Sequence, residues 1–186
     1  MEVLVKNKVL TNTKNNGVKA AATVTVEEFG DGVHHVTKLK LTDFVIGALA
    51  GAGAALGLGS KLYTFPAGVH VEGASYIDLS LKAAGTAVNT DTGLGSVVAT
   101  GAVSVLSGTG TFEDRHTGQT IATAAAGGTA VKSLKNTTAG VNTGIALNVA
   151  ASVKDVFLNA AGTWNANNTG NLTATGTIVL IWNTIV

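Results

Sequence analysis

The feature that most constrains this chain is an alternation of apolar and polar residues with a period of two, while helical periodicity is hard to find. In ASYIDLSLKA (74–83), Ile77, Leu79 and Leu81 lie on one face, whereas Asp78 and Ser80 lie on the other. Successive side chains of a β-strand point to opposite faces of its sheet. The alternation therefore predicts strands with one face turned toward a core. The run LTATGTIVLIWNTIV (172–186) ends apolar on both faces, as in a strand buried from both sides.

Strand-like runs recur along the chain, separated by turn signals. We expect strands within 17–26, 35–46, 74–83, 95–106, 110–118, 142–152, 153–164 and 172–186. Asp91-Thr92-Gly93 and Asn167-Asn168-Thr169-Gly170 are typical turn sequences, and one short helix is expected near 121–126. This pattern predicts an all-β fold, an antiparallel β-sandwich or jelly roll with long Gly/Ala-rich and Thr/Asn-rich loops. We expect a single domain, 1–186, in which 1–16 form an N-terminal arm or an edge strand.

Charge is scarce in this sequence. Charged residues make up 12% of the chain, against roughly 25% in an ordinary globular protein. The net charge is +1 and Arg115 is the only arginine, whereas nucleic-acid readers show a basic face, so no nucleic-acid partner is expected. Either Thr, Asn, Ser and Gly cover the surface, or another subunit does. Cysteine is absent, which excludes a disulfide framework and a thiolate metal site.

The N-terminal sequence MEVLVKNKVLTNTK does not resemble a signal peptide. Its few apolar residues are interrupted by Lys6 and Lys8, and no small-residue cleavage site follows. We therefore expect synthesis in a cytoplasm.

The stretch IGALAGAGAALGLG (46–59) contains almost only glycine, alanine and leucine. It lacks the GxGxxG spacing of dinucleotide sites and the GK[ST] of a P-loop. The uncharged run 44–60 is shorter than the ~20 residues of a membrane-spanning helix, so no membrane partner is expected. We interpret 47–59 as an extended contact loop whose glycine side is open to close backbone approach by a neighbouring subunit.

The residues that could act in catalysis or bind a metal are not arranged in a recognisable site motif. His34 and His35 are adjacent, so in a strand they point to opposite faces, and His70 has Glu72 on its own side. We expect ordinary surface or interface histidines, no metal and no cofactor. The cluster Glu113-Asp114-Arg115-His116 fits an acid/base site, an arginine clamp between subunits, or a charged turn with a local ion pair. Without a GxSxG elbow or a thiol nucleophile, no enzyme is expected.

Two phrases of this chain resemble a known group of proteins. LYTFPAGVHVEGASYIDLSLKA (62–83) and DTGLGSVVATGAVSVLSGTGTFEDRHTGQTIA (91–122) are similar to small structural proteins of tailed bacteriophages, in particular capsid decoration, or cement, proteins. The similarity covers about residues 40–125 and includes no catalytic signature. It implies an all-β protein without an active site, often trimeric, located on the outer capsid surface where capsomers meet.

The sequence therefore predicts a structural virion protein that bridges neighbouring capsid subunits. Its expected partners are further copies of itself, as a homotrimer, and the phage major capsid protein. The alternative is a carbohydrate- or receptor-binding jelly-roll module of a tail or fibre, which would need surface aromatics, and only Trp164 is well placed for that. The residues expected at a subunit or capsid interface are Gly47, Leu49, Gly51, Gly53, Leu56, Leu58, Phe65, Pro66, Arg115 and His116.

Overall fold

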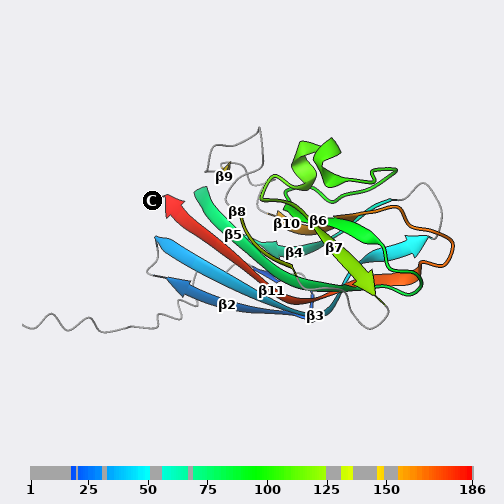
Figure 1. Ribbon diagram of the computed structural model, residues 1–186. Coiled ribbons are helices and arrows are strands. Elements are labelled where there is room, and N and C mark those ends of the chain that lie inside the picture. Colours follow the sequence, from blue (N-terminus) through cyan, green and yellow to red (C-terminus); the bar gives the residue numbers. More distant parts are fainter. Residues whose placement is uncertain are drawn as a thin grey trace, which may run out of the picture.

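The computed structural model describes residues 18–19, 21–30, 33–50, 56–66, 69–124, 131–135, 146–148 and 155–185, and it confirms the expected all-β fold (Figure 1). Within these ranges the only helical pieces are two 3-10 turns, η1 (Leu106–Gly108) and η2 (Gly110–Phe112). The strands are β1 (Val18–Lys19), β2 (Val24–Gly30), β3 (His34–Ala50), β4 (Gly57–Thr64), β5 (Val69–Lys82), β6 (Asn89–Gly95), β7 (His116–Ala124), β8 (Val131–Lys135), β9 (Ala146–Asn148), β10 (Asp155–Ala161) and β11 (Thr169–Ile185). The expected N-terminal arm, 1–16, lies outside the described residues.

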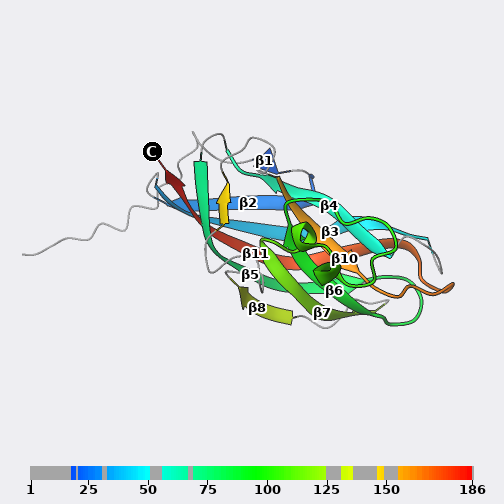
Figure 2. The same cartoon turned by 90° about the horizontal axis from the view of Figure 1, so that it is seen from above.

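The strands belong to one hydrogen-bonded sheet that curls over, so that its two halves pack face to face (Figures 1 and 2). One half, sheet A, has the order β1-β4-β10-β6-β7. The other half, sheet B, has the order β5-β11-β3-β2, and β8 and β9 also pair with β5. The halves join where β5 and β7 run parallel, at Leu81–Thr123 and Lys82–Ala124. The remaining pairings among the described strands are antiparallel.

Strand β11 holds sheet B together, because it pairs with β3 along one edge and with β5 along the other. Its predicted inward face is confirmed: the buried residues are Leu172, Ala174, Ile178, Leu180 and Trp182. The expected burial of its end from both sides is wrong, because Ile181 on the opposite face is 41% exposed. The neighbouring strands bury their own apolar positions in the same core, for example Leu39 and Ile77. Each fully buried side chain of this kind contributes about 1.5–3 kcal/mol, so these faces drive the packing of the two halves.

A third layer, which the alternation does not predict, covers the outer face of sheet A. We call residues 96–115 the cap segment. It leaves β6 after Gly95, forms η1 and η2, and re-enters the sheet at β7 (Figure 1). Its Leu106 and Phe112 pack with Ala161 of β10 in a small cluster separate from the main core. The strands expected within 95–106 and 110–118 are therefore wrong over this segment, because its apolar residues dock on a sheet instead of joining one.

Glycines on sheet A allow the cap segment to lie close to the strands. In the strand register, Gly59 of β4 and Gly93 of β6 flank Asn159 of β10. A Cβ atom on Gly59 would lie 2.1 Å from Oδ1 of Asn159 and 3.0 Å from the backbone nitrogen of Ala99. A Cβ atom on Gly57 would lie 3.2 Å from the carbonyl oxygen of Thr100. At these two glycines, the close neighbour is the chain's own cap segment.

Three local predictions are corrected by the strand pairing. The contact loop expected at 47–59 is strand over its first four and last three residues, since β3 extends to Ala50 and β4 begins at Gly57. The helix expected near 121–126 is strand β7 as far as Ala124, because Ile121 pairs with Thr90 of β6 and is fully buried. The turn expected at Asp91-Thr92-Gly93 lies inside β6, which runs between β10 and β7. Tertiary pairing overrides local propensity in the last two cases.

Gly59→Ala should destabilise the fold, because the added methyl group would overlap the Asn159 side chain and the backbone of Ala99. Overpacking of this kind costs about 1–3 kcal/mol, and urea unfolding should show a loss of that size in the free energy of unfolding. Gly73→Ala is the matched control, since its new Cβ would lie 3.7 Å from the carbonyl oxygen of Ile181, an ordinary van der Waals distance. Equal losses in the two variants would contradict the close approach as the cause.

Candidate functional site

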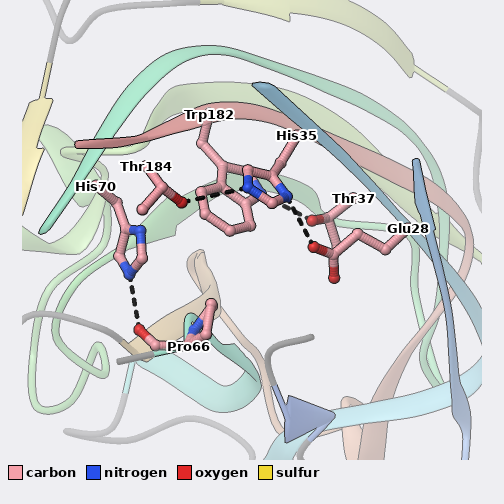
Figure 3. Close-up of polar contacts among 7 residues, drawn as sticks. All are labelled: Glu28, His35, Thr37, Pro66, His70, Trp182 and Thr184. Carbon is pink, nitrogen blue, oxygen red and sulfur yellow. Dashed lines mark hydrogen bonds and ion pairs between the residues drawn. The ribbon is translucent and has the colours of Figure 1, made fainter. Parts of the chain in front are cut away.

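A buried cluster of polar and aromatic side chains lies between the two halves, where β11 ends and β3 begins. The ring of His35 stacks on Trp182 with ring centroids 3.9 Å apart and planes 7° from parallel. Nδ1 of His35 lies 3.1 Å from Oε1 of Glu28, and Nε2 lies 3.2 Å from Oγ1 of Thr184 (Figure 3). His35 thus connects β2, β3 and β11 through one side chain that is 3% exposed.

Trp182 is the centre of this cluster. Its indole N–H donates to Oγ1 of Thr37 at 2.8 Å (Figure 3). Phe65 and His70 pack edge-on against the indole, with centroids 5.2 and 4.9 Å away. His70 lies 2.7 Å from the carbonyl oxygen of Pro66 through Nε2. Because a carbonyl oxygen only accepts hydrogen bonds, Nε2 of His70 carries the proton.

The expectation of surface or interface histidines is wrong for His35, His70 and His116, which are buried, while His34 is exposed. The opposite orientation expected for His34 and His35 is confirmed. His70 points inward because of a β-bulge: β11 pairs Ile181 with Ala74 but Trp182 with Glu72, and so skips Gly73. A bulge of one residue reverses which face later residues occupy. Before Gly73 the even-numbered residues of β5 therefore face the interior. After Gly73 the odd-numbered residues do.

Arg115 is buried next to this cluster and forms an ion pair with Glu72. Its guanidinium carbon lies 5.4 Å from the ring centroid of Phe65. Burial lowers the pKa of Arg115 to about 10, so the side chain remains charged at neutral pH. The ion pair of Arg115 is therefore formed with a residue distant in sequence on β5, in place of the local pair considered for 113–116. Since Arg115 and His116 are buried, they do not present an exposed clamp to a neighbouring subunit.

Ser75 and His116 form a hydrogen-bonded pair that superficially resembles a nucleophile and its base. Oγ of Ser75 lies 2.7 Å from Nδ1 of His116. The same hydroxyl donates to the carbonyl oxygen of Arg115 at 2.9 Å, so its only proton is already engaged. Ser75 is 3% exposed and His116 is fully buried. This pair joins β5 to the start of β7 and offers no surface to a substrate.

Glu28 carries the carboxylate of the cluster and faces inward from the edge strand β2. Burial raises its pKa, and the neighbouring charge and hydrogen bond of His35 oppose this only in part. Adjacent Glu27 is turned to solvent, and the pKa of Glu27 is lowered, mainly by its hydrogen bond with Lys40. Within the part of the chain that the structure describes, no group of three or more His, Asp or Glu residues is arranged to hold a metal ion. Through the contacts of His35 with Glu28 and Thr184, the cluster connects the ends of β2, β3 and β11.

Asn159 forms a second polar centre, beneath the cap segment. Its Nδ2 donates to the carbonyl oxygens of Val97 and Phe112, both at 2.8 Å. Its Oδ1 accepts from the backbone N–H of Ala99 at 3.0 Å. The residue is completely buried. One side chain of β10 therefore fixes both ends of the cap segment to sheet A.

Acidic residues fix the cap segment in the same way. Asp114 accepts hydrogen bonds from the backbone and hydroxyl of Ser96, at 2.7 and 2.6 Å. Burial raises the pKa of Asp114, and these hydrogen bonds oppose the shift. Asp91 accepts from the backbone N–H of Leu106 at 2.8 Å, and Glu113 from that of Gly118 at 2.6 Å. The carboxylates considered for acid/base chemistry thus bind the protein's own backbone.

The predicted interface residues do not form one exposed surface. Gly47 lies against Leu58, where a Cβ would come within 3.1 Å of the leucine Cβ. Leu49, Leu58 and Phe65 are buried in the main core. Leu56 and Pro66 are half-buried. Gly51 and Gly53 lie outside the described residues.

Sequence reasoning missed Asn159, although a signal was present. It is the one polar residue inside the run VFLNAAG (156–162). An amide in an otherwise apolar buried strand needs hydrogen-bond partners. Its position therefore indicated that polar groups from another part of the chain lie against this strand. The partners could not be predicted, because they lie in residues 97–112, far away in sequence.

Comparison with known proteins finds no match to this chain among protein-family models, curated proteins or solved structures. Searching the described ranges for a helix able to cross a lipid bilayer also finds none.

Asn159→Ala should release the cap segment. The carbonyls of Val97 and Phe112 and the N–H of Ala99 would lose a buried partner, and each such loss costs about 1–3 kcal/mol. We expect the free energy of unfolding to fall by about 3 kcal/mol or more, with faster hydrogen exchange at the Ala99 amide. Asn171→Ala, at an exposed position of β11, is the control. A loss no larger than that of the control would show that Asn159 does not anchor the cap.

Glu28→Gln should become more stable relative to wild type as the pH rises. The raised pKa of Glu28 means that its contribution to stability is present below the ordinary value of 4.5 and is lost as the pH rises through the folded-state pKa. Glu27→Gln is a matched control of opposite sign, because the lowered pKa of Glu27 stabilises the fold at higher pH. Urea unfolding at several pH values measures both differences. If the stability of the two variants relative to wild type follows the same pH trend, the opposite pKa shifts of Glu28 and Glu27 are contradicted.

Proposed function

We propose that this protein is a structural virion protein that decorates a phage capsid and stabilises it by bridging neighbouring capsid subunits. The sequence phrases that resemble cement proteins, 62–83 and 91–122, correspond to parts of β4, β6 and β7 together with β5 and the whole cap segment. The observation that carries the proposal is the arrangement of this region. Residues 96–112, which contain no charged residue, are held on a two-layered scaffold by buried hydrogen bonds.

The polar residues of the described chain support a mechanical role. His35, Asn159 and Asp114 each bind side chains or backbone of the same chain, and each connects separate segments. Such connections stiffen a subunit that must resist internal pressure. Many weak contacts repeated over a symmetric shell add by avidity, so no single contact needs high affinity.

The alternative function, a sugar- or receptor-binding module of a tail, has less support. Trp164, the aromatic residue expected to stack on a sugar, is only 4% exposed. Its indole N–H donates to the carbonyl oxygen of Leu56 at 3.1 Å. It therefore closes a loop against the core and does not offer a flat stacking surface.

Cryo-electron microscopy of the particle whose genome encodes this chain tests the proposal. We expect density for the two-layered domain and its cap on the capsid lattice. Particles made without the chain should release their DNA at a lower temperature, and adding back the purified protein should restore the wild-type value. Density confined to the tail or fibre would support the alternative and overturn the proposal.

A further inference from the structure

We draw no further inference here: the strongest candidate, the apolar patch that Phe29 of β2, Val36 of β3 and Ile181 of β11 form across the outer face of sheet B, carries none because nothing in the structure shows what covers it.

Discussion

The structure depends on the close approach of the cap segment to the backbone of sheet A. Sheet A is covered on both sides, by sheet B through the main apolar core and by the cap through the small cluster of Leu106 and Phe112 and through its backbone. On the side of the cap, Gly57, Gly59 and Gly95 leave room for backbone atoms of the cap segment, and Asn159 supplies hydrogen bonds that hold that segment. The glycine-rich composition of β4 and β6 follows from this constraint. The segment that lies close to these glycines is therefore part of the same chain, whereas the sequence predicted a neighbouring subunit.

Polar groups inside the fold specify how its pieces fit together. Glu28 points inward from the edge strand β2 and reaches His35, and an inward-pointing charge is one means by which edge strands avoid pairing with other chains. His35, Trp182 and Thr37 then align β3 with β11. Hydrophobic packing alone would tolerate small shifts between strands, whereas these hydrogen bonds are satisfied in one register. The apolar core supplies most of the stability and the polar cluster selects the arrangement.

The alternation of residues predicted β3, β5 and β11 and their inward faces, because each strand buries one side in the core. It could not predict β6, where the sequence of Asp91 to Gly95 reads locally as a turn and becomes a strand only between β10 and β7. Nor could it predict the inward position of His70, which depends on a bulge at Gly73 that is visible only in the pairing with β11. Asn159 could be recognised as an anomaly, but its partners come from a segment distant in sequence. The local alternation of residues was therefore enough to predict the long strands. The positions and partners of the buried polar residues depend on pairing between distant segments and could not be predicted.

The cap segment is ordered on sheet A before any partner binds, which matters for the proposed role on a capsid. A contact made by a mobile loop would have to order that loop at every copy, and the entropy lost would offset much of the apolar gain. Here the ordering is completed during folding, through Asn159 and the carboxylates of Asp91 and Asp114. In the role proposed above, weak contacts with a shell would add by avidity only when many copies are held together.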